Sequence, residues 1–430
     1  PLFQAEDGIR DDWLRLVGSE MCIRDSPVVI GENVVGVDLK SEIGPGKERK
    51  GKIKIAPELE RRIEGYLRYF DGYGAIIVQL NVEDTRNGVA EFVAEKYGDK
   101  VIIELKWGQG AKDIGGEIQV TSLDYALFLK NRGYVVDPDP SLTEVQQAFE
   151  NGSIKSFARH SRLGATNLDT VEQVRADFMS SVDYLRSIGF KRITLKTGSY
   201  GMEELAMAIK FSTDAGLDLL TIDGSGGGTG MSPWNMMQSW GVPSIDLHSK
   251  AYQYASILAA KGLNVVDMSF AGGFALEDSI FKGLALGAPF TKLICMGRAI
   301  MIPGFVGSNI YGALHPEERG TVNGLWGELP KTVRQVGNSA KEIFAGYFDV
   351  EKKVGKDEMK NIPYGAIAFW TMADKLSCGL QQLLAGARKF SVKNLTRNEL
   401  FSGNRETARE TGIPHVTDVN DESARKILDL

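Results

Sequence analysis

Residues 221–233 read TIDGSGGGTGMSP, and this stretch decides the fold class of the 430-residue chain. A short apolar run, residues 219–222, leads into an acid and then into five glycines. A run of that length is typical of a buried strand and too short for a helix. Glycines let the backbone turn sharply and approach an anion or a flat ring closely. A strand that ends in such a loop is typical of the active-site edge of α/β barrels and sheets.

Outward from this stretch, short apolar runs alternate with helical patterns from residue 27 onward. Predicted strands cover residues 28–31, 75–79, 101–106, 193–196, 219–223, 265–270 and 290–295. Predicted helices between them cover residues 57–70, 85–97, 122–132, 142–150, 169–188, 203–215, 249–261 and 277–286. This alternation predicts βαβ units and a parallel sheet. Because a (β/α)8 TIM barrel needs eight strands, we predict such a barrel without its first strand, which we expect upstream.

The chain is expected to have three parts. Residues 27–310 form the barrel, with an insertion at 107–168 that Pro138 and Pro140 divide into two helical pieces. Residues 311–430 form a helical C-terminal extension, with helices at about 329–348 and 367–390. Residues 1–26 lack a clean helical or strand period, and QAEDGIRD at 4–11 resembles a translated sequencing adapter. We interpret this segment as a non-native leader, with a genuine leader as the alternative.

Composition excludes several classes of function. The net charge is −6 with scattered Lys and Arg, so no nucleic-acid partner is expected. No apolar run approaches the roughly 18 residues of a membrane span. Three cysteines give no disulfide framework, which indicates a reducing cytoplasm. The four histidines lack metal-ligand spacing, so no metal site is predicted.

Charged and amide side chains follow the third predicted strand. The segment KWGQGAKDIGG, residues 106–116, carries Lys106, Gln109 and Lys112 among glycines. Two lysines and an amide on a backbone-rich loop suit a small dicarboxylate. A solvated turn is the alternative, disfavoured because Trp107 and Ile114 would not sit in one.

Two further sites follow later strands. Lys196 closes an apolar strand in LKTG, and a lysine there points into the barrel mouth; a structural salt bridge is the alternative. Loops after the last two barrel strands commonly bind phosphate through backbone N–H groups. Glycines follow both of the corresponding predicted strands here. Gly272 and Gly273 lie in SFAGGF, and Gly297 lies in MGRA together with Arg298.

Residues 106–116 and 221–233 together resemble the FMN-binding synthase domain of glutamate synthases, in particular its stand-alone, glutamate-synthase-like members. The resemblance extends over residues 27–310 and, more weakly, to LQQLLAGARKF in the extension. It implies an FMN barrel in which Lys196 contacts the flavin, while Gln109 and Lys112, with Lys106 nearby, hold 2-oxoglutarate. It also implies that the loop beside the flavin holds Ser225, Gly227, Gly228, Thr229 and Gly230, and that the phosphate loops hold Gly272, Gly273, Gly297 and Arg298.

The resemblance implies reductive amination of 2-oxoglutarate through 2-iminoglutarate, with hydride from reduced FMN, in glutamate biosynthesis. Ser225 and Gly226 stand where the family has His-Asp, and Glu117 stands where it has glutamine. Only Cys295 lies where the family places three cluster cysteines, so an iron–sulfur cluster is not expected in this chain. Glutaminase and reductase subunits are the expected sources of ammonia and electrons.

Three alternatives stay open. The chain could be a subunit of an N-methylglutamate-forming enzyme, which moves an amine onto a glutamate skeleton. It could also be an FMN-binding subunit that is active only with partner chains. A hydroxy-acid-oxidase type of barrel is disfavoured, because such enzymes use a histidine base near the late strands and none lies between His248 and His315.

Overall fold

The computed structural model describes residues 27–30, 57–70, 72, 74–80, 88–107, 117–131, 135–160, 170–199, 201–227, 241–318 and 326–430. Its centre is a seven-stranded parallel sheet in the order β1-β2-β3-β7-β8-β9-β10. The strands are β1 (Pro27–Ile30), β2 (Ala75–Leu80), β3 (Ile102–Lys106), β7 (Ile193–Thr197), β8 (Leu219–Asp223), β9 (Met268–Ala271) and β10 (Thr291–Ile294). Each strand pairs with the next one along the sheet, as in a (β/α)8 barrel. The predicted α/β fold, a partial (β/α)8 barrel, is confirmed.

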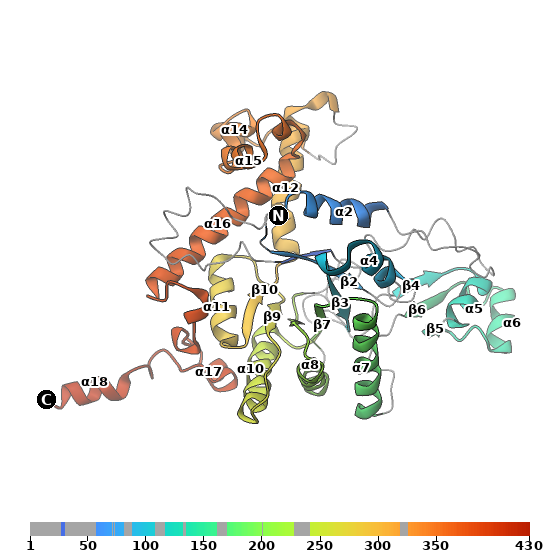
Figure 1. Ribbon diagram of the computed structural model, residues 1–430, viewed down its shortest axis with the longest axis horizontal. Coiled ribbons are helices and arrows are strands. Elements are labelled where there is room, and N and C mark those ends of the chain that lie inside the picture. Colours follow the sequence, from blue (N-terminus) through green and yellow to red (C-terminus); the bar gives the residue numbers. More distant parts are fainter. Residues whose placement is uncertain are drawn as a thin grey trace.

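Helices connect these strands and surround the curved sheet (Figure 1), and their buried residues pack with one face of it in a single hydrophobic cluster. They are α2 (Pro57–Arg68), α4 (Val89–Tyr97), α7 (Val171–Ser187), α8 (Met202–Ala215), α10 (Ser244–Ala260) and α11 (Glu277–Gly287), and α12 (Arg298–Leu314) follows β10. Alternate strand residues such as Ile103, Leu195 and Ile222 are buried against helix residues in the main hydrophobic cluster. Because side chains alternate along a strand, the intervening residues project to the opposite face, into the barrel.

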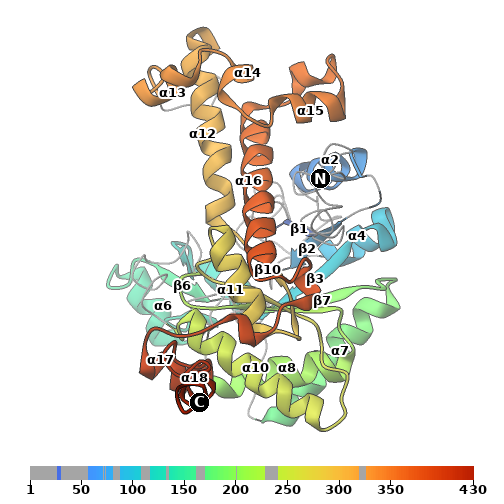
Figure 2. The ribbon, with the colours of Figure 1, turned by 90° about the vertical axis from the view of Figure 1, so that its left-hand side faces the viewer.

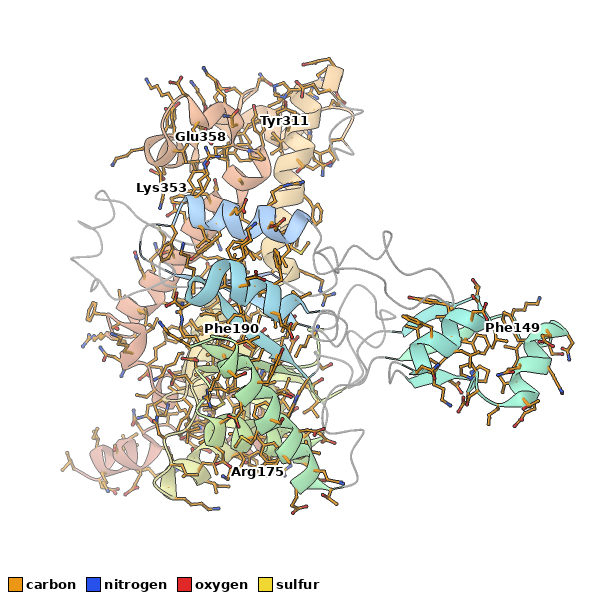
Figure 3. The ribbon with its side chains drawn as sticks, turned by 45° about the vertical axis from the view of Figure 1, so that its right-hand side comes forward. Phe149, Arg175, Phe190, Tyr311, Lys353 and Glu358 are labelled. Carbon is orange, nitrogen blue, oxygen red and sulfur yellow. The ribbon has the colours of Figure 1, made fainter. Side chains whose placement is uncertain are left out.

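The insertion folds as a small separate lobe. It contains β4 (Glu117–Val120), α5 (Leu123–Asn131), β5 (Val135–Asp137), α6 (Thr143–Glu150) and β6 (Phe157–His160). The strands form an antiparallel sheet in the order β4-β6-β5, and the Phe149 and Phe157 rings stack at 5.2 Å inside the lobe. Figure 3 shows Phe149 in this lobe, away from the barrel. The two helical pieces are confirmed; the sheet was not predicted, because strands of three or four residues give no clear period.

The C-terminal extension is built on an antiparallel helix pair, α12 and α16 (Tyr364–Gly386), which rises from the barrel (Figure 2). At its far end lie α13 (Lys331–Val336), α14 (Ala340–Ile343) and α15 (Tyr347–Val354). The single helix predicted at 329–348 is therefore wrong. The break after α13 lies at Gly337, where an added Cβ would fall 2.2 Å from the Glu342 Cβ. The predicted helix at 367–390 corresponds to α16.

Helix α12 was missed by the sequence prediction, because Pro303 and several glycines lie in it. The predicted boundary at residue 310 falls inside this helix. The chain continues through α17 (Arg405–Thr411) to α18 (Asp421–Leu428). The Arg397 guanidinium donates to the carbonyl oxygens of Leu286 and Thr411, and these bonds connect the tail to α11. Short 3-10 turns lie at Gly98–Lys100, Pro316–Glu318, Glu358–Asn361, Val392–Asn394 and Arg397–Glu399. The predicted leader, residues 1–26, lies outside the described residues.

Candidate active site

The carboxyl ends of β3 and β7 place two lysines side by side. Lys106 and Lys196 are register partners, and both project to the barrel face of the sheet. Lys106 is only 6% exposed, and the Lys196 side chain is 18% exposed. Two predicted site residues, one assigned to the substrate and one to the flavin, are thus brought together.

Lys196 forms an ion pair with the acid that ends β8. Its Nζ lies 3.0 Å from Asp223 Oδ2, and the Asp223 side chain is 3% exposed. Burial alone would lower the pKa of Lys196, but the charge and hydrogen bond of Asp223 outweigh it and raise that pKa above its usual range. Lys196 is therefore a cation at neutral pH. Lys196 therefore forms the salt bridge that was the alternative interpretation, and it also lies at the end of a barrel strand.

A buried carboxyl lies one layer below the two lysines. Glu104 on β3 is 1% exposed, and its oxygens accept hydrogen bonds from the Gln79 amide and, at 3.0 Å, from the Thr194 hydroxyl. Burial raises the pKa of Glu104, opposed by these hydrogen bonds and by Lys196 and Lys106. The sequence analysis did not single out Glu104; the available signal was an acid within an otherwise apolar strand.

The glycine-rich loop after β8 is held by backbone hydrogen bonds to its neighbours. The Gly224 N–H donates to Ala271 O at 2.9 Å, and the Ser225 N–H donates to Val242 O at 2.9 Å. Gly226 has a φ of +99°, which favours glycine. At Gly227 an added Cβ would fall 1.8 Å from Asp223 Oδ1, so only glycine fits beside that carboxylate.

Ser244, the first residue of α10, joins this loop to the next one. Its hydroxyl lies 3.0 Å from Ser225 O and 2.9 Å from Gly272 O. A Cβ added at Gly224 would fall 2.3 Å from Ser244 Oγ, and one added at Gly272 would fall 2.6 Å from it. Ser244 is wedged between two glycines, a role that no local sequence signal marks.

The predicted phosphate residues lie around the same loop. Gly272 and Gly273 have φ values of +106° and +85°, and Gly297 precedes the first turn of α12. The exposed Arg298 guanidinium donates to Gly226 O at 2.7 Å. Among the described residues, an added Cβ would meet no atom within 4 Å at Gly273 or Gly297, so these residues leave space over both backbones. The loops after β8, β9 and β10 therefore meet at one corner of the mouth.

Other predicted site residues are not described. Gln109, Lys112, Gly228, Thr229 and Gly230 lie outside the described residues, so their position relative to Lys106 and Lys196 stays a prediction.

Two further buried titratable groups lie on either side of the sheet: Cys295 faces the barrel, and His248 on α10 packs against the outer face. Cys295 Sγ is 3.1 Å from Ser269 Oγ, and burial raises the pKa of its thiol. His248 is 1% exposed, stacks on Phe270 at 4.0 Å, and its Nε2 lies 3.1 Å from Ile222 O. Burial lowers the pKa of His248 to about 4, against the effect of its backbone hydrogen bonds. Within the described ranges, no set of three His, Cys, Asp or Glu residues could hold a metal ion.

No helix in the described part of the chain is both long and apolar enough to cross a membrane.

Residues 165–304 match the model of a conserved region in glutamate synthase. The glutamate synthase large subunit-like protein YerD of Bacillus subtilis (strain 168) is 29% identical over 218 residues, which cover 48% of this chain and 36% of that protein. The archaeal-type glutamate synthase [NADPH] of Dehalococcoides mccartyi is 27% identical over 189 residues, which cover 44% of this chain and 32% of that protein.

These matches cover about a third of the length of the two relatives. A solved structure, a soluble mutant of (S)-mandelate dehydrogenase from Pseudomonas putida, aligns with a TM-score of 0.36 and 14% identity over 78% of this chain and 66% of that one. Strands β7 to β10 and the loops that surround Lys196, Asp223 and Arg298 all lie within residues 165–304. The predicted resemblance to glutamate synthases is confirmed over residues 165–304, which match that conserved region.

Proposed function

We propose that this chain is an FMN-binding oxidoreductase of the glutamate synthase type, acting on a glutamate-like amino acid or 2-oxo acid. The observation that carries the proposal is the corner of the mouth where the Lys196–Asp223 pair lies beside the glycine loops after β8, β9 and β10. All of these residues fall in the matched region, residues 165–304. In the proposed reaction, bound FMN would supply hydride transfer to or from a substrate carbon.

The described residues fit such a cofactor. Backbone N–H groups at Gly272, Gly273 and Gly297, with the Arg298 guanidinium, would hold the phosphate, since glycine backbones approach anions closely and helix N-termini favour negative charge. The space that the described residues leave over Gly273 and Gly297 supports this assignment. Ser225 and Gly227 would lie beside the ring, where Lys196 would favour negative charge on it.

Substrate binding is proposed for the neighbouring part of the mouth, at the end of β3. Lys106 would hold a carboxylate, together with Gln109 and Lys112 from the loop that follows it. Lys106 and Lys196 share one register position, which supports a site where a dianionic acid meets two cations. The Asp223 carboxylate, which is paired with Lys196, would balance part of this positive charge. The finer reaction, reductive amination of 2-oxoglutarate, belongs to this proposal.

Ammonia and electrons would come from partner chains with glutaminase and reductase activity. The chain matches about a third of its relatives' length, so their complete activity is proposed here only for an assembly. The low cysteine content supports a reducing compartment, the cytoplasm.

The test is an absorption spectrum of the full chain after incubation with FMN. We expect flavin bands that remain after gel filtration, bleach on adding glutamate, and return, once reduced, on adding 2-oxoglutarate with ammonia. Arg298→Ala should weaken FMN binding; Arg175→Ala, which removes an exposed arginine on α7 (Figure 3), is the matched control. A chain that remains colourless after incubation with FMN would overturn the proposal.

A further inference from the structure

Four ionisable side chains project into the partial barrel from three neighbouring strands: Glu104, Lys106, Lys196 and Asp223. Among them, Lys196 and Asp223 form an ion pair at the mouth, with Nζ 3.0 Å from Oδ2. The Asp223 side chain is 3% exposed, so water screens this pair weakly. The cation that would face the ring is thus closely compensated by one buried anion.

The Asp223 carboxylate is fixed on both of its oxygens. Oδ2 faces the Lys196 ammonium, and Oδ1 packs against Gly227, where an added Cβ would fall only 1.8 Å away. The Gly227 N–H in turn donates to Gly224 O at 3.0 Å, which closes the turn around the carboxylate. Asp223 therefore has little freedom to move away from Lys196.

We propose that Asp223 tunes the reduction potential of the bound flavin by compensating the positive charge of Lys196. The proposal rests on the proposed function, in which FMN occupies this mouth. Reduction places negative charge on the ring, which a nearby cation stabilises and a nearby anion destabilises. Because the two charges are opposite and 3.0 Å apart, their combined effect on the ring is much smaller than that of Lys196 alone. Asp223 is a positioning residue, since it acts through Lys196.

A purely structural role would give a different result. If Asp223 served only to offset the cost of burying the Lys196 charge, its replacement would change the free energy of unfolding and leave the reduction potential of the flavin unchanged. The midpoint potential separates the two roles, because it compares oxidised and reduced states of the same folded protein.

The experiment is a redox titration of the FMN-loaded full chain carrying Asp223→Asn. We expect the equilibrium to shift toward reduced flavin by about tenfold, which is about 30 mV upward for a two-electron couple. The matched control is Asp214→Asn, which breaks another lysine–aspartate pair, with Lys210 on the outer helix α8. A potential for Asp223→Asn equal to that of wild type and of the control would overturn the proposal.

A second pair of variants covers the case in which Asp223→Asn does not fold. Lys196→Met should lower the potential, and Lys196→Met with Asp223→Asn, which leaves neither member of the pair charged, should restore it toward wild type. Equal potentials for these two variants would also overturn the proposal. A wild-type chain that binds no FMN would instead overturn the proposed function, and this inference with it.

Discussion

The hydroxyl of Ser244 lies 2.9 Å from the carbonyl oxygen of Gly272, and so joins the start of α10 to the loop after β9. The same hydroxyl lies 3.0 Å from Ser225 O in the loop after β8. One side chain thus holds together the loop proposed to lie beside the ring and a loop proposed to bind the phosphate. The corner depends on a residue that belongs to neither loop.

Replacement of Ser244 by alanine should loosen this corner. We expect Ser244→Ala to lower the free energy of unfolding by about 0.5–1.5 kcal/mol, the usual net value of such a hydrogen bond, and to weaken FMN binding. Chemical unfolding and a flavin fluorescence titration measure the two effects. Ser256→Ala is the matched control on the same helix, because the Ser256 hydroxyl donates to Tyr252 O, away from the loops. Equal flavin affinity in both variants would contradict the linking role.

The space beside Asp223 predicts that Gly227 tolerates no side chain. Gly227→Ala would place Cβ 1.8 Å from Oδ1, so the carboxylate must move away from Lys196 or the loop must shift. We expect a loss of about 1–3 kcal/mol in the free energy of unfolding, the usual cost of overpacking. Thermal unfolding measures it, with Gly403→Ala as the control, because no atom of the described residues lies within 4 Å of that added Cβ. A wild-type melting temperature for Gly227→Ala would show that the site relaxes freely.

Burial of His248 predicts a pH dependence of stability on the acidic side. Its pKa falls from 6.5 to about 4 in the folded chain, because burial disfavours the charged ring. Between these pH values the unfolded chain binds a proton that the folded chain does not. Stability should therefore fall as the pH drops below about 6.5, by at most about 1.4 kcal/mol per pH unit from this residue.

His248→Gln should remove that contribution. The variant should be less stable than wild type at neutral pH, since the stacking on Phe270 is lost. The difference in the free energy of unfolding between the two proteins should become smaller toward pH 4. Urea unfolding of both proteins at several pH values measures the difference. Two stability curves that run parallel over this range would contradict the assignment.

The sequence predicted the barrel well because each strand has a local signal. The apolar runs before Lys106, Lys196 and Asp223 are read directly as buried strands, and the order of the sheet follows the order of the chain. Placement of lysines at the carboxyl ends of β3 and β7 follows from that order alone. Helix α12 was missed because Pro303 and the glycines around it weaken the helical pattern. In the folded chain, packing on α16 stabilises the helix despite these residues.

Partners across the sheet could not be predicted in the same way. Glu104 meets Thr194, which is 90 residues away in the chain, and Lys196 meets Asp223 only because β7 and β8 pair in one register. A shift of that register by one residue would turn these side chains to the other face. No spacing in one sequence encodes such contacts, so the charge balance of the mouth emerges only from the folded chain.

Close contact between α12 and α16 gives a last prediction. An added Cβ at Gly307 would fall 2.4 Å from Tyr364 O and 2.7 Å from the Gly365 Cα. One at Gly304, a turn earlier on the same helix, would meet no atom of the described part of the chain within 4 Å. Gly307→Ala should therefore force the helices apart and cost about 1–3 kcal/mol. Gly304→Ala should gain up to about 1 kcal/mol from helix propensity, because nothing opposes the added methyl group. The melting temperatures of the two variants should move in opposite directions; a melting temperature of Gly307→Ala at or above that of wild type would show that this helix pair adjusts its separation without cost.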